Sequence, residues 1–356
     1  MNAMLLAAGL GLRMRPLTQD RPKPALSVLG RPLAIQNLQR MRDASIEHAV
    51  LNLHYCPDAL RAILGEGGQG GMPRVSYTIE DPILGTGGGL RNARDLLIGD
   101  GPILAHNADF LSDVDFAAMR DTHDSGDQLA TLALAPSREG YSKVDIDHEG
   151  RIVSLAGLPE VDPKSVAGSF LFTGCHLLDD SVLDRLPATG PSNIIDTYRE
   201  LAVERRLGAY LHPGFWWEFG TPRCFLDGHL ALLDLDEATR SGIGDHDPVR
   251  EVAGCPLVST GPGVELDAGV VLSGRCSLAM AARIGEGSRL EDSVVLEESW
   301  IGPRGRLRRV IVGPHTELPA GFEARDAVVC PDLTPDRDPG EGVERHAGLL
   351  IRPLAG

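Results

Sequence analysis

The sequence predicts an α/β domain followed by a parallel β-helix, and three observations lead to this prediction. Over the first eighty residues, short apolar runs alternate with segments of helical spacing, which is the order of elements in an α/β sheet. From Val258 onward, small aliphatic residues recur every six positions, which is the period of a triangular β-helix. The length of 356 residues indicates two domains, and the 42 glycines and 25 prolines imply many turns.

The composition excludes several classes of partner and site. The net charge of −16 argues against nucleic acid or an anionic membrane as a partner. The sequence has no apolar run of about eighteen residues, so we expect no transmembrane helix. No basic segment precedes the apolar N-terminal stretch, so we expect no signal peptide. The six cysteines lie far apart without a C-x-x-C pair, which predicts reduced thiols in the cytoplasm rather than a disulfide framework or a zinc site.

The first predicted strand, Met4–Ala8, leads into a glycine-rich turn with a high density of positive charge. Gly9 and Gly11 lack side chains, so backbone N–H groups can approach a bulky anion. Arg13 adds a forked cation, and Lys23 adds a point charge between two prolines. The first 31 residues hold five basic residues and one acid within an acidic chain. This segment is therefore predicted to bind a polyphosphate.

Two common phosphate-binding motifs do not fit this turn. A dinucleotide-binding G-x-G-x-x-G would need a glycine at Met14, and the P-loop G-x-x-x-x-G-K-[ST] is absent. A plain strand-to-helix turn with surface arginines is the simpler alternative. The actual pattern, G-x-G-x-R-x-x-P-x-T followed by P-K-P, resembles the signature of sugar-1-phosphate nucleotidyltransferases. This resemblance runs over residues 2–236 and implies a Rossmann-like mixed-sheet nucleotidyltransferase catalytic domain over residues 1–240.

The elements of this domain follow from the spacing of apolar residues and from the turn residues between them. We expect helices at residues 32–44, 58–64, 90–97, 115–125, 193–206 and 223–237. We expect strands at residues 49–53, 75–79, 102–106, 129–135 and 169–174, and a hairpin over residues 141–153.

A second glycine-rich segment precedes the helix expected at residue 90. Glycines at a helix N-terminus let the backbone approach a flat or anionic group closely, and a flexible loop is the alternative. In the resembling family, this G-T-G-G element packs against the nucleotide base. The resulting nucleotide-binding set is Leu6, Ala7, Ala8, Gly9, Gly11, Arg13, Gly85, Thr86, Gly87 and Gly88.

Two carboxylates are expected to hold Mg²⁺, the predicted cofactor. Asp109 follows the strand at 102–106, where metal-dependent phosphoryl enzymes place a ligand. Glu218 stands where the family has Asp in W-x-D-[IV]-G-T-P, so its carboxylate lies one methylene further out. His106, beside this site, is expected to be a packing residue rather than a base.

The resemblance also implies a sugar site, with two departures from the family pattern. Ser142 replaces a glycine, and the E-K-P motif that often supplies a sugar-phosphate lysine is missing. Lys143 or Lys164 are the candidates to replace that lysine. The expected sugar-binding residues are Asn107, Ser142, Lys143 and Gly174.

The six-residue period predicts about four coils of about eighteen residues between Val258 and Val329. It resembles the left-handed, hexapeptide-repeat β-helix that many of these transferases append, and we expect this domain over residues 251–330 and a C-terminal tail over 331–356. An appended acyltransferase would need a longer solenoid and a catalytic histidine, whereas these repeats contain only His315 and no lysine. We therefore expect a scaffold, and a homo-oligomer.

The resemblance implies an enzyme that converts a nucleoside triphosphate and a sugar-1-phosphate into an NDP-sugar and pyrophosphate. Arg13, Lys23 and Asp109 are the expected catalytic residues: Arg13 holds the β- and γ-phosphates, and Lys23 bridges the α-phosphate and the sugar phosphate. The alternative is a non-catalytic NDP-sugar-binding regulatory subunit. The base and sugar stay open among guanylyl transfer to mannose-1-phosphate, which is favoured, uridylyl transfer to N-acetylmuramate-1-phosphate and thymidylyl transfer to glucose-1-phosphate.

Overall fold

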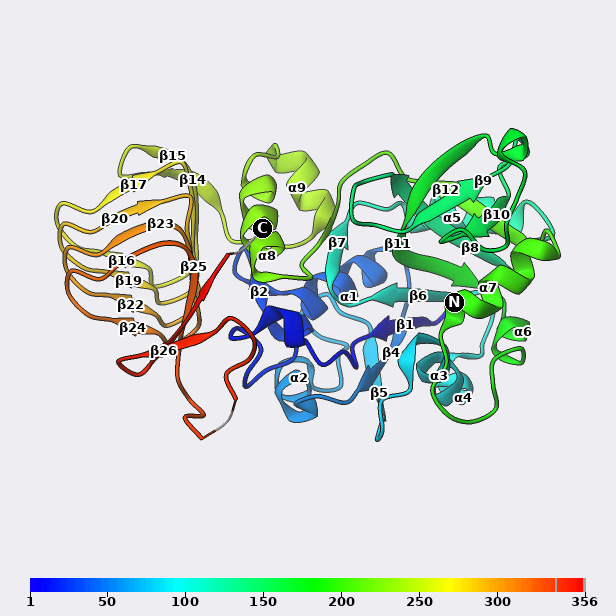
Figure 1. Cartoon of the computed structure of the whole chain (residues 1–356), viewed down its shortest axis with the longest axis horizontal. Helices are drawn as coiled ribbons and strands as arrows, with labels where there is room; N and C mark the ends of the chain where they lie inside the picture. Colours follow the sequence, from blue (N-terminus) through cyan, green and yellow to red (C-terminus); the bar gives the residue numbers. More distant parts are fainter. Residues whose placement is uncertain (337, 355–356) are drawn as a thin grey trace. The chain divides into compact units, whose positions relative to one another are not determined.

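The chain divides into two compact units, each of which combines separate stretches of sequence (Figure 1). The computed structural model describes residues 1–336 and 338–354. Unit 1 comprises Met1–Gly9 and Asn37–Trp216, and unit 2 comprises Leu10–Gln36 and Trp217–Gly356. The segment that follows the first strand therefore packs with the C-terminal part of the chain. The predicted boundaries at residues 240, 251 and 330 stay a prediction.

Unit 1 is built on a mixed sheet, as the sequence predicts. In the described residues this sheet has nine strands, in the order β10-β9-β11-β6-β1-β4-β5, with β8 between β11 and β12. Strands β1, β4, β5 and β6 are parallel, whereas β11 is antiparallel to β6, β8 and β9. The strands are β1 (Ala3–Leu6), β4 (His48–Leu53), β5 (Arg74–Ile79), β6 (Ile103–Asn107), β8 (Ala130–Pro136), β9 (Lys143–Ile146), β10 (Ile152–Leu155), β11 (Gly168–Leu178) and β12 (Leu207–Leu211).

Two of the helices associated with this sheet begin at residues whose side chains cap them. The Asp115 carboxylate accepts hydrogen bonds from the backbone N–H groups of Ala117 and Ala118, and the Asn193 side chain accepts one from Ile195. The helices are α1 (Leu33–Asp43), α2 (Pro57–Leu64), α3 (Gly85–Asn92), α4 (Arg94–Leu97), α5 (Phe116–Asp124), α6 (Asp180–Leu183) and α7 (Ile194–Val203).

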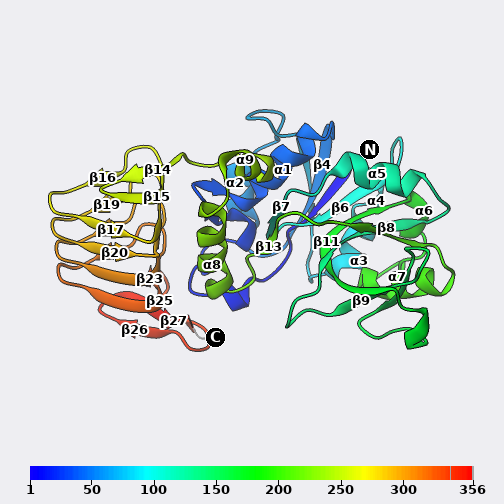
Figure 2. The same ribbon diagram turned by 90° about the horizontal axis from the view of Figure 1, so that it is seen from above.

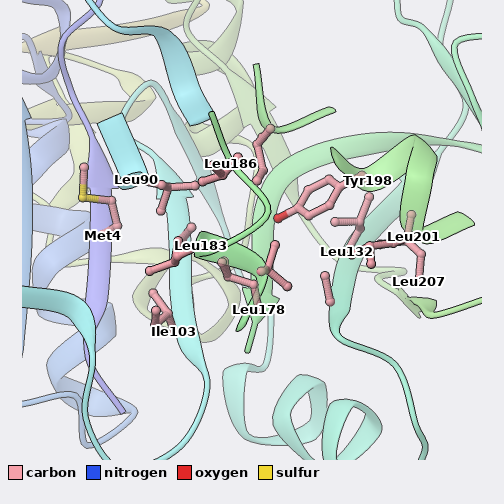
Figure 3. Packing of buried hydrophobic residues seen from close by; sticks show 14 of the residues in the cluster. Met4, Leu90, Ile103, Leu132, Leu178, Leu183, Leu186, Tyr198, Leu201 and Leu207 are labelled. Carbon is pink, nitrogen blue, oxygen red and sulfur yellow. The ribbon is translucent and has the colours of Figure 1, made fainter. Parts of the chain in front are cut away.

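Residues of one core cluster of unit 1 come from its strands, from α3, α6 and α7, and from the loop after α6 (Figure 3). Burying each large aliphatic side chain contributes about 1.5–3 kcal/mol before the entropy of ordering it is counted. The labelled members are Met4, Leu90, Ile103, Leu132, Leu178, Leu183, Leu186, Tyr198, Leu201 and Leu207.

Several expected boundaries are wrong, and packing explains two of them. The helix expected over residues 90–97 is divided at Ala93, and the helix expected over residues 223–237 ends at Leu233. The glycines from Gly85 onward form the first turns of α3, not a loop before a helix, because they pack closely against the chain around Ser192. The strand expected to end at Gly174 continues as β11 to Leu178. An irregularity between Phe172 and His176 interrupts its pairing with β8 but not the strand itself.

Unit 2 contains the predicted parallel β-helix, whose stacked coils are visible in Figure 2. One column of fully or nearly fully buried side chains, Ile284, Ile301 and Leu318, pairs in register from coil to coil. The step between coils is 18 residues from Leu266 to Ile284 and then 17 residues, so a one-residue shortening explains why the six-residue period becomes irregular. The strands are β14 (Val249–Val252), β15 (Cys255–Thr260), β16 (Glu265–Leu266), β17 (Val271–Ser273), β18 (Arg275–Leu278), β19 (Arg283–Ile284), β20 (Arg289–Glu291), β21 (Val294–Val295), β22 (Trp300–Ile301), β23 (Arg306–Val312), β24 (Glu317–Leu318) and β25 (Glu323–Pro331).

Helix α8 (Pro222–Leu233) packs against the β-helix and is tied to it by charge. Arg309 Nη2 lies 2.9 Å from Asp227 Oδ1 on α8, and Arg275 Nη1 lies 2.7 Å from Asp234 Oδ2 just after it. The next helix, α9 (Glu237–Ile243), leads into β14.

The segment predicted as a C-terminal tail contains two strands, β26 (Glu344–His346) and β27 (Leu349–Pro353). Strand β27 pairs antiparallel with β25, the last strand of the β-helix. Its Leu350 is fully buried. The segment thus covers the end of the solenoid, as terminal caps of repeat proteins do.

Within the described ranges of the chain, none of the helices has the length and apolar character needed to cross a membrane.

Candidate functional site

The predicted site residues belong to both units, so each group is described within its own unit. Residues up to Gly9, the α3 glycines and the expected sugar-binding residues lie in unit 1, together with Asp109. Gly11, Arg13, Lys23 and Glu218 lie in unit 2.

A buried hydrogen-bond network connects the end of β1 to the start of α3 in unit 1. The Asn52 Oδ1 atom accepts a hydrogen bond of 2.8 Å from the backbone N–H of Ala7. Asn52 Nδ2 donates to Glu80 Oε1 at 2.7 Å, and Glu80 Oε2 accepts from the backbone N–H of Leu84 at 2.7 Å. The Glu80 side chain is 1% exposed. Because each of its oxygens has a donor, the network holds the two expected nucleotide-binding segments in a fixed relation.

The glycines of α3 are required by close packing. A Cβ at Gly87 would lie 2.7 Å from Ser192 Oγ, and a Cβ at Gly89 would lie 2.7 Å from Glu80 Oε1. The N–H of Gly87 donates to the Ser192 carbonyl at 2.9 Å, and Gly88 donates to the same oxygen at 3.4 Å. These two N–H groups therefore already have an acceptor within unit 1. A base would contact the outer surface of this turn rather than accept hydrogen bonds from these N–H groups.

Asn107 and Gly174, two of the expected sugar-binding residues, lie side by side. Gly174 has a φ of +87°, and a Cβ there would lie 2.6 Å from Asn107 Nδ2. Trp216 Nε1 donates to the carbonyl of the neighbouring Thr173 at 2.9 Å. The ring of Phe110 lies 6.2 Å from that of Trp216. Asn107, Phe110, Thr173, Gly174 and Trp216 therefore form one continuous wall.

The turn before β9 brings two side chains to this wall that the sequence did not predict there, Arg138 and Tyr141. The Arg138 guanidinium lies 5.4 Å from the centre of the Trp216 ring, and the Tyr141 ring meets it edge-on at 5.4 Å. Ser142 and Lys143 follow directly, and Lys143 pairs with Leu171 across the sheet. Arg138 and Tyr141 were missed because no motif marks them.

His106 is a packing residue, as expected. It is 2% exposed, and its ring stacks on Phe110 at 4.0 Å. Its Nδ1–H donates to the Asn107 carbonyl at 2.6 Å. Burial lowers the pKa of His106 to about 3, so its ring is neutral near pH 7 and is not a strong proton acceptor.

The signature loop in unit 2, Gly11–Thr18, is a compact turn with its arginine pointing outward. Gly11 has a φ of +64°, which favours glycine. Its carbonyl accepts hydrogen bonds from Thr18 Oγ1 at 2.8 Å and from the Met14 N–H at 2.9 Å, at the start of the 3-10 turn Leu12–Met14. The Arg13 side chain is 69% exposed. Lys23 opens a second short turn, Lys23–Ala25, between two prolines that fix its backbone.

Arg13 and Glu218 form an ion pair. Arg13 Nη2 lies 3.6 Å from Glu218 Oε1, and the Glu218 side chain is 23% exposed. A Cβ at Gly220 would lie 2.6 Å from Glu218 Oε1, so this glycine makes room for the carboxylate. The cation expected at the phosphates and one carboxylate expected at the metal are therefore neighbours.

Asp109 and Glu218 have the chemistry that a hard divalent cation prefers, because both offer carboxylate oxygens. In the part of the chain that the structure describes, there is no cluster of three or more His, Cys, Asp or Glu side chains able to hold a metal. A two-carboxylate site shared with a phosphate is compatible with that finding. Since the two residues lie in different units, their joint role stays a prediction.

Comparison with known proteins gives consistent matches along the chain. A family model described as nucleotidyl transferase matches residues 2–234. A mannose-1-phosphate guanylyltransferase of Mycobacterium tuberculosis is 31% identical over 310 residues, covering 83% of this chain and 80% of that protein. Mannose-1-phosphate guanylyltransferase 1 of Arabidopsis thaliana is 28% identical over 352 residues, covering 93% and 96%.

A solved structure supports the fold independently. The putative glucose-1-phosphate thymidylyltransferase of Bacillus anthracis superposes with a TM-score of 0.58 at 20% identity, covering 66% of this chain and 96% of that one. At this identity, the similarity shows the fold alone.

Proposed function

This chain belongs to the nucleotidyl transferase family, and we propose that it transfers a guanylyl group from GTP to mannose-1-phosphate, with release of pyrophosphate. The observation that carries the proposal is the match of 31% identity to a mannose-1-phosphate guanylyltransferase over most of both chains. The prediction of a nucleotidyltransferase enzyme is confirmed by the family match. No finding favours the alternative of a non-catalytic regulatory subunit.

The reaction needs positioning and charge neutralisation rather than a covalent intermediate. An oxygen of the sugar phosphate attacks the α-phosphorus in line, and pyrophosphate leaves on the opposite side. Two unit charges about 4 Å apart repel by about 4 kcal/mol at an effective dielectric constant of 20. Lys23, between the α-phosphate and the sugar phosphate, offsets this repulsion, and Arg13 neutralises the charge that develops on the leaving pyrophosphate.

Asp109 and Glu218 would hold the divalent cation, for which we propose Mg²⁺. The bound ion would supply Lewis-acid stabilisation to the phosphate oxygens. The ion pair between Arg13 and Glu218 balances two charges in the ligand-free protein. A bound phosphate would give Arg13, and a bound cation would give Glu218, a new partner of opposite charge.

Two groups of residues in unit 1 recognise the other parts of the substrates, one the nucleotide and one the sugar. The end of β1 and the α3 turn, linked by Asn52 and Glu80, form the nucleotide side. The wall of Asn107, Gly174 and Trp216, with Ser142 and Lys143 beside it, forms the sugar side. The cytoplasmic location and the self-association expected from the sequence are retained as parts of this proposal.

The test is a matrix of substrates with pyrophosphate release as the readout. The purified full chain is assayed with ATP, GTP, CTP, UTP and dTTP against mannose-, glucose- and N-acetylmuramate-1-phosphate, in the presence of Mg²⁺. We expect the highest kcat/KM for GTP with mannose-1-phosphate. A clear preference for UTP or dTTP would overturn the proposed specificity, and absence of release from every pair would overturn the proposed activity.

A further inference from the structure

Arg352, near the C-terminal end of the chain, is bound directly to the backbone of the signature loop. Its Nη1 atom donates hydrogen bonds to the carbonyl of Arg13 at 2.9 Å and to the carbonyl of Arg15 at 2.7 Å. All three residues lie in unit 2. One cationic nitrogen thus bridges two carbonyls that are separated from it by more than three hundred residues of sequence.

The element that carries Arg352 is well anchored. Strand β27 pairs antiparallel with β25, and Arg352 itself lies opposite Val328. The N–H of Leu354 donates to the Asp326 carbonyl at 2.7 Å, two residues beyond Arg352. The guanidinium is therefore presented from the capped end of the β-helix rather than from a free chain end.

The carbonyls of Arg13 and Arg15 alternate with carbonyls that the loop's own backbone engages. Met14 N–H donates to Gly11, Arg15 N–H donates to Leu12, and Leu17 N–H donates to Met14. A basic side chain on the last carbonyls is a known way to end a helical turn. Because Arg352 binds the carbonyls of Arg13 and Arg15, on the two sides of the buried Met14, it fixes the peptide plane that directly follows the Cα atom of the exposed Arg13.

Two further contacts hold the same segment from the β-helix side. Arg21 Nη1 lies 3.1 Å from Glu297 Oε1, and both side chains are mostly buried. A Cβ at Gly340 would lie 3.1 Å from Arg15 Cδ, so the chain that leads to β26 passes closely over Arg15. These contacts explain why Leu10–Gln36 packs with the C-terminal part of the chain.

We propose that Arg352 is a positioning residue for the triphosphate, acting through the backbone of the signature loop on Arg13. The inference rests on the proposed function, in that Arg13 binds the β- and γ-phosphates. It assigns to the C-terminal strand a part in substrate binding that a scaffold would not have. When the Arg352 bridge is lost, Arg13 is still present, but the loop is free to move the Arg13 guanidinium away from the phosphates.

The experiment compares three variants of the full chain. Arg352→Met removes the donor at nearly constant length, and Arg352→Lys restores one cationic nitrogen that can bridge both carbonyls. Arg325→Met, on the neighbouring strand β25, is the matched control, because Arg325 is 69% exposed and pairs only locally with Asp326. Steady-state KM for GTP and for mannose-1-phosphate is measured separately, and calorimetry measures binding of GTP and of GMP.

We expect R352M to raise the KM for GTP about tenfold, as displacement of a binding group does, with the KM for mannose-1-phosphate unchanged. GTP binding should weaken to the same extent while GMP binding is kept, because the β- and γ-phosphates are the affected groups. R352K should recover most of the loss, and R325M should behave like the wild type.

Three other outcomes overturn the inference. In the first, R352M binds GTP as tightly as the wild type does. In the second, R352M weakens equally for GTP and mannose-1-phosphate, or for GTP and GMP, and in the third, R352K does not recover GTP binding. If R352M does not fold, Arg352→Gln, whose amide is too short to reach the loop, replaces it in the same comparison. A wild-type protein that binds GTP but releases no pyrophosphate refutes the proposed function alone, and the calorimetric arms still decide on Arg352.

Discussion

The two segments that contact the nucleotide in our proposal are stabilised in different ways. In unit 1, the end of β1 and the turn of α3 are connected by Asn52 and Glu80, whose hydrogen bonds are buried and mutually satisfied. In unit 2, the signature loop is exposed at Arg13, and its own hydrogen bonds span only three to seven residues. A further restraint on this loop comes from Arg352, far away in sequence, and Glu297 holds Arg21 just beyond it.

The difference shows two ways of holding segments to which our proposal gives a role in nucleotide binding. A buried, fully paired network resists change because any lost partner leaves a polar group unsatisfied. An exposed loop with a long cationic side chain can change partners, as our proposal requires of Arg13 when a phosphate replaces Glu218. In unit 1, the buried hydrogen bonds of Asn52 and Glu80 keep the end of β1 and the α3 turn rigid. In unit 2, the signature loop is held at the two carbonyls that the distant Arg352 binds. The predictions below test this contrast.

The largest effect is expected from Lys23→Ala, in the short turn that follows the signature loop. Removal of a cation that stabilises the transition state costs about 10³-fold in kcat, which corresponds to about 4 kcal/mol. The fold should be retained, because Lys23 lies in a short turn whose backbone is fixed by Pro22 and Pro24. Pyrophosphate release gives the rate, and circular dichroism with a thermal melt checks the fold.

The control for this variant is Arg325→Ala, which removes one positive charge from a side chain that is 69% exposed and that has no part in the proposed site. Near-normal turnover of K23A would show that Lys23 is not the catalytic cation. Equal losses in K23A and R325A would attribute the effect to overall charge.

The second effect concerns the network in unit 1 and is expected in stability as well as in binding. Glu80→Ala leaves Asn52 Nδ2 and the Leu84 N–H without their acceptor, which costs about 3 kcal/mol in the free energy of unfolding. The KM for GTP should rise while the KM for mannose-1-phosphate stays unchanged. Urea denaturation and separate KM measurements check both parts.

Glu80→Gln is the matched variant, because its amide keeps one acceptor oxygen and should lose only part of the stability. If E80A unfolds at the same urea concentration as the wild type, the network does not stabilise unit 1. A stability loss without any change in the KM for GTP would mean that the network serves the fold but not the nucleotide.

The sequence predicts the features that are local or periodic. The β-helix follows from the six-residue period, because each coil repeats the same inward position. The signature loop, and the prediction that Arg13 binds phosphate, follow from a motif of about fifteen residues. Asn52 stands out in the sequence as a polar residue within the apolar run Ala49–Leu53. Nothing in the sequence, however, indicates that it is hydrogen-bonded to Glu80.

What the sequence does not reveal depends on packing between distant segments. The sequence predicts that the helix starts only at Leu90, after the glycines that in fact begin α3, because their fit against Ser192 is set by a segment about a hundred residues later. The bridge from Arg352 to the loop depends on how β27 returns along β25, and one arginine near a chain end carries no local signal for it. Such contacts are visible only once the two segments are placed together.

The smallest effect is expected from Glu218→Asp, which shortens the carboxylate by one methylene and restores the residue usual at this place in the resembling family. The pair with Arg13 is largely solvent-exposed on the arginine side, and such pairs contribute about 0–1 kcal/mol, so thermal stability should hardly change. Activity should be retained within a few-fold and should still require a divalent cation. The measurement is a Mg²⁺ titration of turnover in chelator-treated protein. Since Mg²⁺ is sensitive to ligand placement, the midpoint of that titration should shift for E218D, whereas turnover in either protein without any divalent cation would exclude the carboxylate pair as a metal site.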